Sequence, residues 1–342
     1  MLFSGTFVLF PLSNRLDRDL VPRNSLPILK PPNPSLIGLT YFKKVYVIMI
    51  VLSSSNPRHV RATVAHPTPC GSGGVYIRHI FMIAWGMFGF LIKKTFFDMW
   101  DNLIRIVLLN LGFIVAFAVI IYFPLLFRDV PVLFFAALGI GMGILFVYSG
   151  VVSTLASSVA DYTKPEFKDF LPALKATYPS SLLFALVNLV LVILLQVAFQ
   201  VYGGIKSFVG PLASSFLFWV MIFWILAFQY FFSIQARLDK KFGKLIKKMF
   251  LLLLDNPLFT IGLLIGTVIT FVLSLFTAFL LPGIASIFLW WNVALKLRLY
   301  KYDYLEENPE NRRHIPWDAL LTEDRERVGK RTLKGMIFPW KE

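Results

Sequence analysis

Charged side chains are scarce in this sequence, and their scarcity decides the class of protein. They make up 15% of the residues, against about 25% in a typical soluble domain. Hydrophobic residues reach 57%, with 35 phenylalanines, and the mean hydropathy is +0.70. Because so many apolar side chains exceed what a soluble core can bury, lipid has to be the solvent for most of them. The composition predicts an all-α integral membrane protein, a bundle of spanning helices.

Residues that carry catalysis are also few. The single cysteine, Cys70, excludes an internal disulfide framework and any multi-cysteine metal site. No G-x-S-x-G, P-loop or H-E-x-x-H motif occurs. We therefore expect no enzymatic activity, no catalytic or metal-binding residue and no cofactor. The histidines do not pair at metal-ligand spacing within any apolar run; they are His59, His66, His79 and His314.

Acidic residues are outnumbered, with 19 Asp and Glu against 34 Lys and Arg and a formal charge of +15. No recognisable nucleic-acid-reading module accompanies this charge, so we expect no nucleic-acid partner. The basic residues lie between and after the apolar runs, where they set topology and contact anionic lipid headgroups on the inner face. The expected lipid contacts are Lys93, Lys94, Lys240, Lys241, Lys244, Lys247 and Lys248.

The chain divides by composition into four parts. Residues 1–75 hold nine of the twenty prolines, which is typical of a disordered leader. Alternatively, the natural protein starts at Met82 or Met87, and residues 1–81 or 1–86 come from an over-extended gene prediction. Residues 76–101 fit an amphipathic helix in the membrane interface. Residues 102–299 form a six-span membrane domain, and residues 300–342 a charged cytoplasmic tail.

Six apolar runs approach or exceed the length that crosses about 30 Å of hydrocarbon. The links after the first, third and fifth are tight turns, whereas the links after the second and fourth are longer and rich in lysine. Because Lys and Arg are retained on the cytoplasmic side, we expect a multi-pass protein of the cytoplasmic (inner) membrane with both termini inside. The runs cover residues 102–127, 130–157, 180–202, 211–234, 258–281 and 283–299.

The chain also resembles itself. Residues 89–117 align with residues 243–271 at eleven of twenty-nine positions, including the Lys93-Lys94 and Asp101-Asn102 pairs. A third, weaker unit begins near residue 166. Each unit would comprise a basic in-plane helix, a break at Asp-Asn or at Tyr178-Pro179, and a membrane hairpin. The repeat predicts six spans as three hairpins, each preceded by a cytoplasmic interfacial amphipathic helix.

Amides, rather than charges, are the polar residues inside these runs. Charged groups within a membrane usually mark an ion path, so their confinement to the boundaries disfavours proton- or sodium-coupled transport. Gln196 and Gln200 lie one turn apart on one face. The amides either contact a ligand or make interhelical hydrogen bonds, worth about 0.6–2 kcal/mol each. The set is Asn110, Asn188, Gln196, Gln200, Gln229 and Asn292.

The tail carries charges of both signs, and residues 317–327 are compatible with an exposed helix. Aromatic residues return at 336–340, so the tail has the character of a docking element. It docks at the membrane interface, in a groove of a partner or on the protein's own inner face. A solvated, disordered tail is the remaining alternative.

Over residues 88–299 the chain resembles the YesL-like family of bacterial membrane proteins of unknown function. The resemblance rests on Asn102-Leu103 with Asn110-Leu111, on the link at 167–178 and on residues 242–258. It implies a small multi-spanning protein of the bacterial inner membrane, associated with carbohydrate uptake systems, with no catalytic residues.

Two functions are compatible with these features. The first is a non-enzymatic accessory, assembly or regulatory component of a membrane transport system, with the lipid bilayer and a transport complex as partners. The alternative is a small transporter or lipid-handling protein with an amide-lined path between the hairpin repeats. The sequence names no substrate, partner or oligomeric state.

Overall fold

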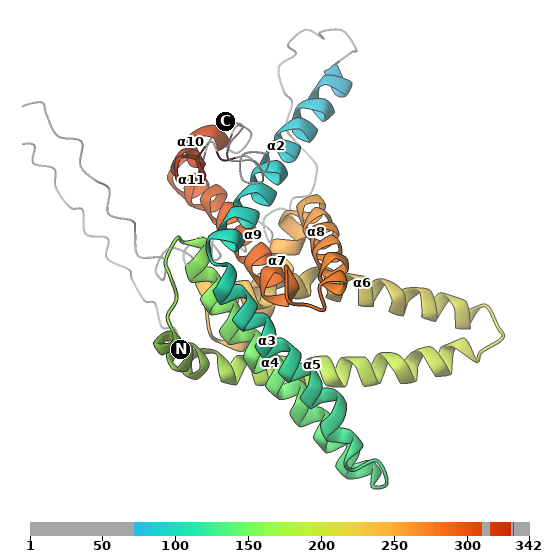
Figure 1. Ribbon diagram of the computed structural model, residues 1–342. Coiled ribbons are helices and arrows are strands. Elements are labelled where there is room, and N and C mark those ends of the chain that lie inside the picture. Colours follow the sequence, from blue (N-terminus) through green and yellow to red (C-terminus); the bar gives the residue numbers. More distant parts are fainter. Residues whose placement is uncertain (1–71, 310–314, 330, 332–342) are drawn as a thin grey trace, which may run out of the picture. The chain divides into compact units, whose positions relative to one another are not determined.

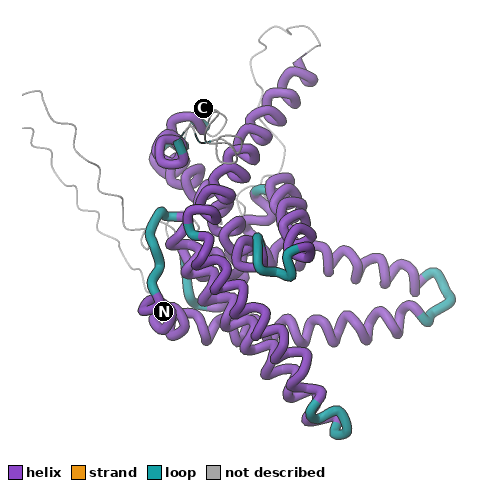
Figure 2. The backbone as a smooth tube through the Cα atoms, viewed as in Figure 1, coloured by secondary structure: helices purple, strands orange, loops and turns teal. Residues whose placement is uncertain are grey.

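A computed structural model describes residues 72–309, 315–329 and 331, with side chains placed from Met87 onward. Every regular element in these residues is helical (Figures 1 and 2). Residues 1–71 of the expected leader and the aromatic stretch at 336–340 lie outside the described residues. The elements are α2 (Ser72–Asp101), α3 (Leu103–Leu125), α4 (Pro131–Ala160), the 3₁₀ turn η1 (Phe167–Asp169), α5 (Phe170–Gly203), α6 (Val209–Arg237), α7 (Phe242–Asp255), α8 (Pro257–Phe276), α9 (Gly283–Glu307), α10 (Trp317–Leu320) and α11 (Thr322–Val328).

Five helical segments are long and apolar enough to cross a membrane. They are α3, α4, η1 together with α5, α6 and α8. A bilayer needs about 20 such residues per helix, and these segments have 20 to 37. They mark the chain as a multi-pass membrane protein. The sixth predicted run, residues 283–299, lies in α9, which is not among the five, so the six-span arrangement stays a prediction.

Helix α9 differs from the others because protein surrounds it. It contacts α2, α3, α4, α6 and α8, and its side chains are buried almost without interruption from Gly283 to Arg298. Its basic residues Lys296 and Arg298 are also largely buried and do not extend into water. The guanidinium of Arg298 stacks 3.7 Å from the centroid of the Phe259 ring, and Arg298 is only 9% exposed. A helix packed in this way tolerates polar residues that a lipid-facing helix does not.

The core surrounds α9 at one end of the long helices. Buried residues cluster in the last third of α4, in the first half of α5 and at the end of α6. Aromatic rings fill the space between them: Phe288 stacks on Phe113 at 5.6 Å, and Phe184 lies against Phe231. The links 161–166 and 238–241 are at this same end, which we call the link end.

The other halves of α3–α4 and α5–α6 form two hairpins. Within each hairpin the two helices pack on each other, and the two hairpins diverge toward their tips (Figure 1). Most side chains on these halves are exposed, including Val132, Phe135, Phe216 and Trp219. An aqueous protein cannot leave so much apolar surface uncovered, so these halves are the part that meets lipid.

Two of the three predicted helix breaks are confirmed, and the third is wrong. Helix α2 ends at Asp101 before α3, and α7 ends at Asp255 before α8, so both Asp-Asn pairs of the repeat interrupt a helix. By contrast, α5 runs unbroken through Pro179. Packing against α6 holds the helix together there, because Gln235 donates to the carbonyl of Thr177 at 3.0 Å and to the hydroxyl of Ser180 at 2.7 Å. Neighbouring helices commonly support a proline in this way.

Candidate functional site

Polar groups from four parts of the chain meet at the link end. They come from α2, from the link after α4, from α9 and from α11, which belongs to the tail. We call them the ionic cluster, and its members are Lys94, Asp98, Asp161, Tyr162, Lys296 and Asp324. The cluster is notable because charged side chains are rarely buried unless they are paired.

Asp324 occupies the middle of the ionic cluster and is 2% exposed. Its Oδ1 lies 3.2 Å from Nζ of Lys296 and 3.8 Å from Nζ of Lys94. Lys94 is itself fully buried and also pairs with Asp98, one turn along α2, at 2.8 Å. A carboxylate on the tail therefore joins two lysines that belong to α2 and α9.

Asp161 forms the second arm of the cluster. Its Oδ1 lies 3.5 Å from Nζ of Lys296, and its Oδ2 accepts a hydrogen bond from Arg237 at 2.8 Å. Lys296 also donates to the carbonyl of Ala160 at 3.0 Å. With Arg237 included, three cations face three carboxylates, so the charges balance only while Asp324 is in place.

Tyr162 supplies an aromatic face to the cations. It sits at a φ of 60°, just after α4. Nζ of Lys94 lies 3.7 Å, and Nζ of Lys296 4.9 Å, from the centroid of its ring. Its hydroxyl donates to the backbone carbonyl of Asp324 at 3.4 Å. Cation–π contacts of this kind gain strength where the cation is desolvated, so Tyr162 helps to hold both lysines beneath α11.

Burial and charge shift the pKa values of the cluster in opposite directions. Burial raises the pKa of Asp98 to about 6, although Lys94 opposes this, and burial lowers the pKa of Lys94. Burial would also raise the pKa of Asp324, but Lys296 and Lys94 outweigh it and hold that pKa below its usual value. The tail carboxylate therefore stays ionised at neutral pH.

Apolar and polar contacts outside the ionic cluster also hold α10 and α11 in place. Leu321 and Val328 are 1% and 2% exposed. Nζ of Lys93 donates to the carbonyl of Gly329 at 3.0 Å, and Arg331 binds both oxygens of Asp101 at 2.9 Å. The described part of the tail therefore docks on the link end of its own chain, which is one of the alternatives predicted from the sequence.

Two of the seven lysines expected to contact lipid lie elsewhere. Lys94 is fully buried in the ionic cluster, and Lys248 is 6% exposed with its Nζ 3.5 Å from Asp239. These two residues occupy the same position in the internal repeat, and each ends beside an aspartate. Asp98 lies only four residues from Lys94, but the burial of both lysines depends on tertiary packing, which the pattern of basic residues does not reveal. Lys93 is partly exposed, whereas Lys240, Lys241, Lys244 and Lys247 are exposed near or on α7, opposite a face that buries Leu245, Met249, Leu252 and Leu253.

Four of the six predicted amides hold helices together. Asn110 donates to the carbonyls of Leu280 and Pro282 at 2.9 Å and accepts from the amide of Ala285 at 2.7 Å, so it fixes the α8–α9 turn. Asn292 donates to the backbone and the hydroxyl of Ser153.

The other two of these four act similarly. Asn188 accepts from the indole of Trp224 at 3.0 Å, and Gln229 accepts from Thr267 at 3.4 Å. Gln196 and Gln200 are exposed on α5, while Gln229 is 2% exposed against α8. The structure therefore does not bring Gln196, Gln200 and Gln229 together as the lining of one path.

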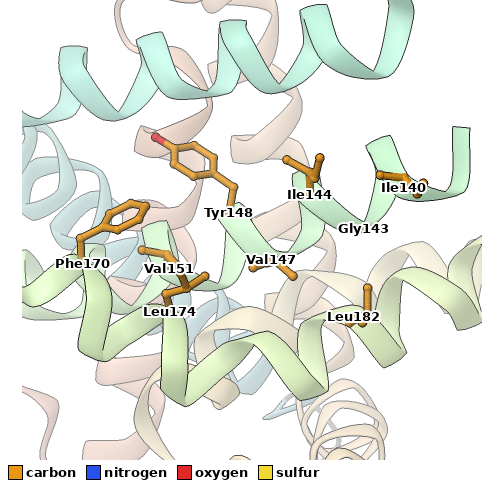
Figure 3. Close-up of a pocket in the computed structure, with 9 residues that line it drawn as sticks. All are labelled: Ile140, Gly143, Ile144, Val147, Tyr148, Val151, Phe170, Leu174 and Leu182. Carbon is orange, nitrogen blue, oxygen red and sulfur yellow. The ribbon is translucent and has the colours of Figure 1, made fainter. Parts of the chain in front are cut away.

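One cavity among the described residues is apolar. It has a volume of about 440 Å³ and lies between α4 and α5, with Gly143, Val147 and Leu182 among its lining (Figure 3). The hydroxyl of Tyr148, the polar side-chain group of the lining, turns away and donates to the carbonyl of Leu109 on α3 at 2.8 Å. Such a cavity suits an alkyl chain and offers nothing to a polar solute.

Sequence reasoning missed the centre of the ionic cluster. Asp324 lies in a stretch of mixed charges that looks fully solvated, and no local pattern separates it from its neighbours. One signal was available: Lys296 falls within the last apolar run, and a lysine there requires a counter-ion.

Comparisons of the chain with protein-family models, with curated proteins and with solved structures each found no match.

Proposed function

We propose that this chain is a non-enzymatic component of a membrane transport system, acting as an accessory, assembly or regulatory subunit. The observation that carries the proposal is the position of Asp324, a tail carboxylate held between the buried Lys94 and the partly buried Lys296. In this proposal the tail covers the surface that a partner engages. The YesL-like resemblance points to the same class of protein.

The buried polar groups of the described residues are largely engaged within the protein. The amides of the core fasten helices, the buried lysines and aspartates are paired, and Arg298 stacks on the Phe259 ring. The tail, in contrast, is held by two short helices with three buried side chains, one of which is the ion-paired Asp324. Elements with few buried contacts open at low free-energy cost. Opening would uncover Lys94 and Lys296, which can then accept an acidic side chain from a partner.

The basic links favour a cytoplasmic location for this end. Lys240, Lys241, Lys244 and Lys247 project from the same end as the ionic cluster, and basic residues near membrane helices are retained inside. We propose that the tail and the links face the cytoplasm at a bacterial inner membrane.

Purification from native membranes in mild detergent tests this function. The wild type and Asp318→Asn, which changes an exposed carboxylate on α10, should retain the same transport-system subunit at fixed stoichiometry. Asp324→Asn should change the amount retained at least severalfold, because the tail no longer closes the cluster. A protein that purifies without a stoichiometric partner in all three forms contradicts the proposal.

The apolar cavity of Figure 3 favours a second candidate, lipid handling. Filling it with Gly143→Leu would displace an alkyl chain seated between α4 and α5. Native mass spectrometry of the wild type and this variant tests the idea: lipid retained equally by both excludes the cavity as its site.

A further inference from the structure

Arg298 on α9 is a buried cation that faces no anion. It is 9% exposed, and within the described residues it forms no ion pair and donates no hydrogen bond. The buried lysines differ, since Lys94 pairs with Asp98 and Lys248 with Asp239. An arginine keeps its proton in a protein, and a buried charge without a partner carries a large free-energy cost. The charge of Arg298 therefore calls for an anion that these residues do not supply.

Two aromatic rings flank the guanidinium of Arg298 without accepting its N–H groups. Its Cζ lies 3.7 Å from the centroid of the Phe259 ring and 6.0 Å from that of the Trp317 ring on α10. Cation–π contacts replace part of the lost hydration, but the N–H donors of a guanidinium point outward in its plane. Nε is sealed from solvent without an acceptor, whereas the two terminal nitrogens are not sealed. An oxyanion from outside can therefore reach the terminal nitrogens.

A second donor without an acceptor lies beside Arg298. The indole N–H of Trp317 makes no hydrogen bond in the part of the chain that the structure describes, although a tryptophan at the edge of a core usually finds a partner. The indoles of Trp224, Trp290 and Trp291 each donate to an oxygen of the protein. One oxyanion beside both groups would satisfy the guanidinium and the indole together.

The carboxylate of Asp255 acts on Arg298 from a distance but does not pair with it. Its Oδ2 accepts hydrogen bonds from Lys301, Asn256 and Tyr302. Lys301, 3.2 Å away, already balances its charge. Asp255 is thus committed to other partners at the end of α7, and Arg298 keeps an uncompensated positive charge.

These donors lie where a membrane span begins. Phe259 is the third residue of the candidate span Pro257–Phe276. Its neighbours Leu258 and Ile261 are 78% and 45% exposed, as side chains that face lipid are. Basic pockets at the ends of spanning helices are typical sites for phospholipid head groups. The phosphate of a phospholipid is therefore within the reach of this pair of donors.

We propose that Arg298 and Trp317 form a binding site for an oxyanion of the phosphate class. The terminal nitrogens of Arg298 hold the phosphate oxygens in the bidentate manner typical of arginine, and the indole N–H of Trp317 donates to the same group. A phospholipid head group and free phosphate share this chemistry. The site is separate from the ionic cluster, because Lys296, two residues earlier, points to roughly the opposite side of α9.

Thermal unfolding of the full chain in dodecyl maltoside, a neutral detergent, gives the first test. A ligand that binds the folded protein raises the unfolding temperature. Phosphatidylglycerol should raise it, and diacylglycerol, which has the same chains without the phosphate, should not. No rise with inorganic phosphate assigns the site to a lipid head group, whereas a rise with inorganic phosphate that matches phosphatidylglycerol assigns it to the soluble anion. A wild type that responds to neither phosphate compound leaves water as the partner of Arg298 and overturns the proposal.

Variants give the second test. Arg298→Gln should weaken phosphatidylglycerol binding about tenfold or more. Without ligand it should unfold no lower than the wild type, because a buried charge without a partner is gone. If Arg298→Gln does not fold, Arg298→Lys, which keeps the charge but not the planar fork, should show most of the same loss. Trp317→Phe, which removes only the N–H donor, should weaken binding severalfold.

Arg128→Gln is the matched control. Arg128 lies at the tip of the first hairpin with its side chain 77% exposed, and its replacement removes the same charge without touching the site. This variant should bind phosphatidylglycerol as the wild type does. A thermal shift that Arg298→Gln and Arg298→Lys retain in full, or that Arg128→Gln loses to the same extent as Arg298→Gln, contradicts a site at Arg298.

Discussion

Replacing Asp324 by asparagine removes one negative charge from the ionic cluster and almost nothing else. The carboxylate is 2% exposed and lies 3.2 Å from Lys296 and 3.8 Å from Lys94. Three carboxylates then become two, facing three cations. Breaking a buried pair on one side costs about 3–5 kcal/mol. Because the Lys296 side chain is 12% exposed, we take the lower end of this range, about 3 kcal/mol. That free energy corresponds to a decrease of roughly a hundredfold in the equilibrium constant for docking of α11.

Hydrogen–deuterium exchange of the α11 amides measures this equilibrium directly, since local opening exposes them. Asp324→Asn should speed their exchange roughly a hundredfold, while α4 and α9 remain protected. Asp318→Asn is the matched control: its carboxylate is 91% exposed and pairs with Arg325, and such surface pairs contribute little. If α11 exchanges within about threefold in the two variants, the ionic cluster does not hold the tail.

Three further outcomes follow from single positions. Burial raises the pKa of Asp98 from 3.8 to about 6, so between these pH values the folded protein holds a proton that the unfolded chain releases. The wild type should therefore lose thermal stability relative to Asp98→Asn as pH rises from 4 through 6. A difference in stability between the two proteins that does not change with pH would refute this. Asn110→Ala unties the α8–α9 turn and should cost about 2–4 kcal/mol in thermal unfolding. Asn308→Ala removes a single hydrogen bond, from the Asn308 side chain to the backbone carbonyl of Tyr304 at the end of α9, and should cost far less. Gly283→Ala places a Cβ against the Asn110 amide at a φ of +70° and should impair folding as judged by monodispersity in detergent, whereas Gly243→Ala, with open space around it, should not.

Features that depend on neighbours in the sequence were predictable. The apolar runs gave the long helices, since hydrophobic length is the main determinant of a membrane helix. The Asp101-Asn102 and Asp255-Asn256 pairs gave two helix breaks because the interruption is local. The amide of Asn110 was recognised as a packing or ligand group, and it packs.

Features that depend on distant contacts were not predictable. In the sequence, helix α9 looked like a short membrane span. Five other helices surround it, and burial on all sides produces no periodic pattern of apolar residues that would distinguish it from a helix in lipid. Pro179 signalled a break that the packing of α6 overrides. Lys94 and Lys248 looked like lipid contacts because their burial is set by tertiary structure. The position of Asp324 likewise follows from how α11 docks, which no local pattern encodes.

The central claim is that the hairpin tips and the links lie on opposite sides of a membrane. In a Cys70→Ser background, single cysteines at Asp129 and Ser207 mark the two tips, and cysteines at Lys164 and Lys240 mark the links. Labelling of intact and permeabilised cells with an impermeant maleimide should modify the tip pair from outside and the link pair only after permeabilisation. Labelling of a tip and a link from the same side of intact cells would contradict the account.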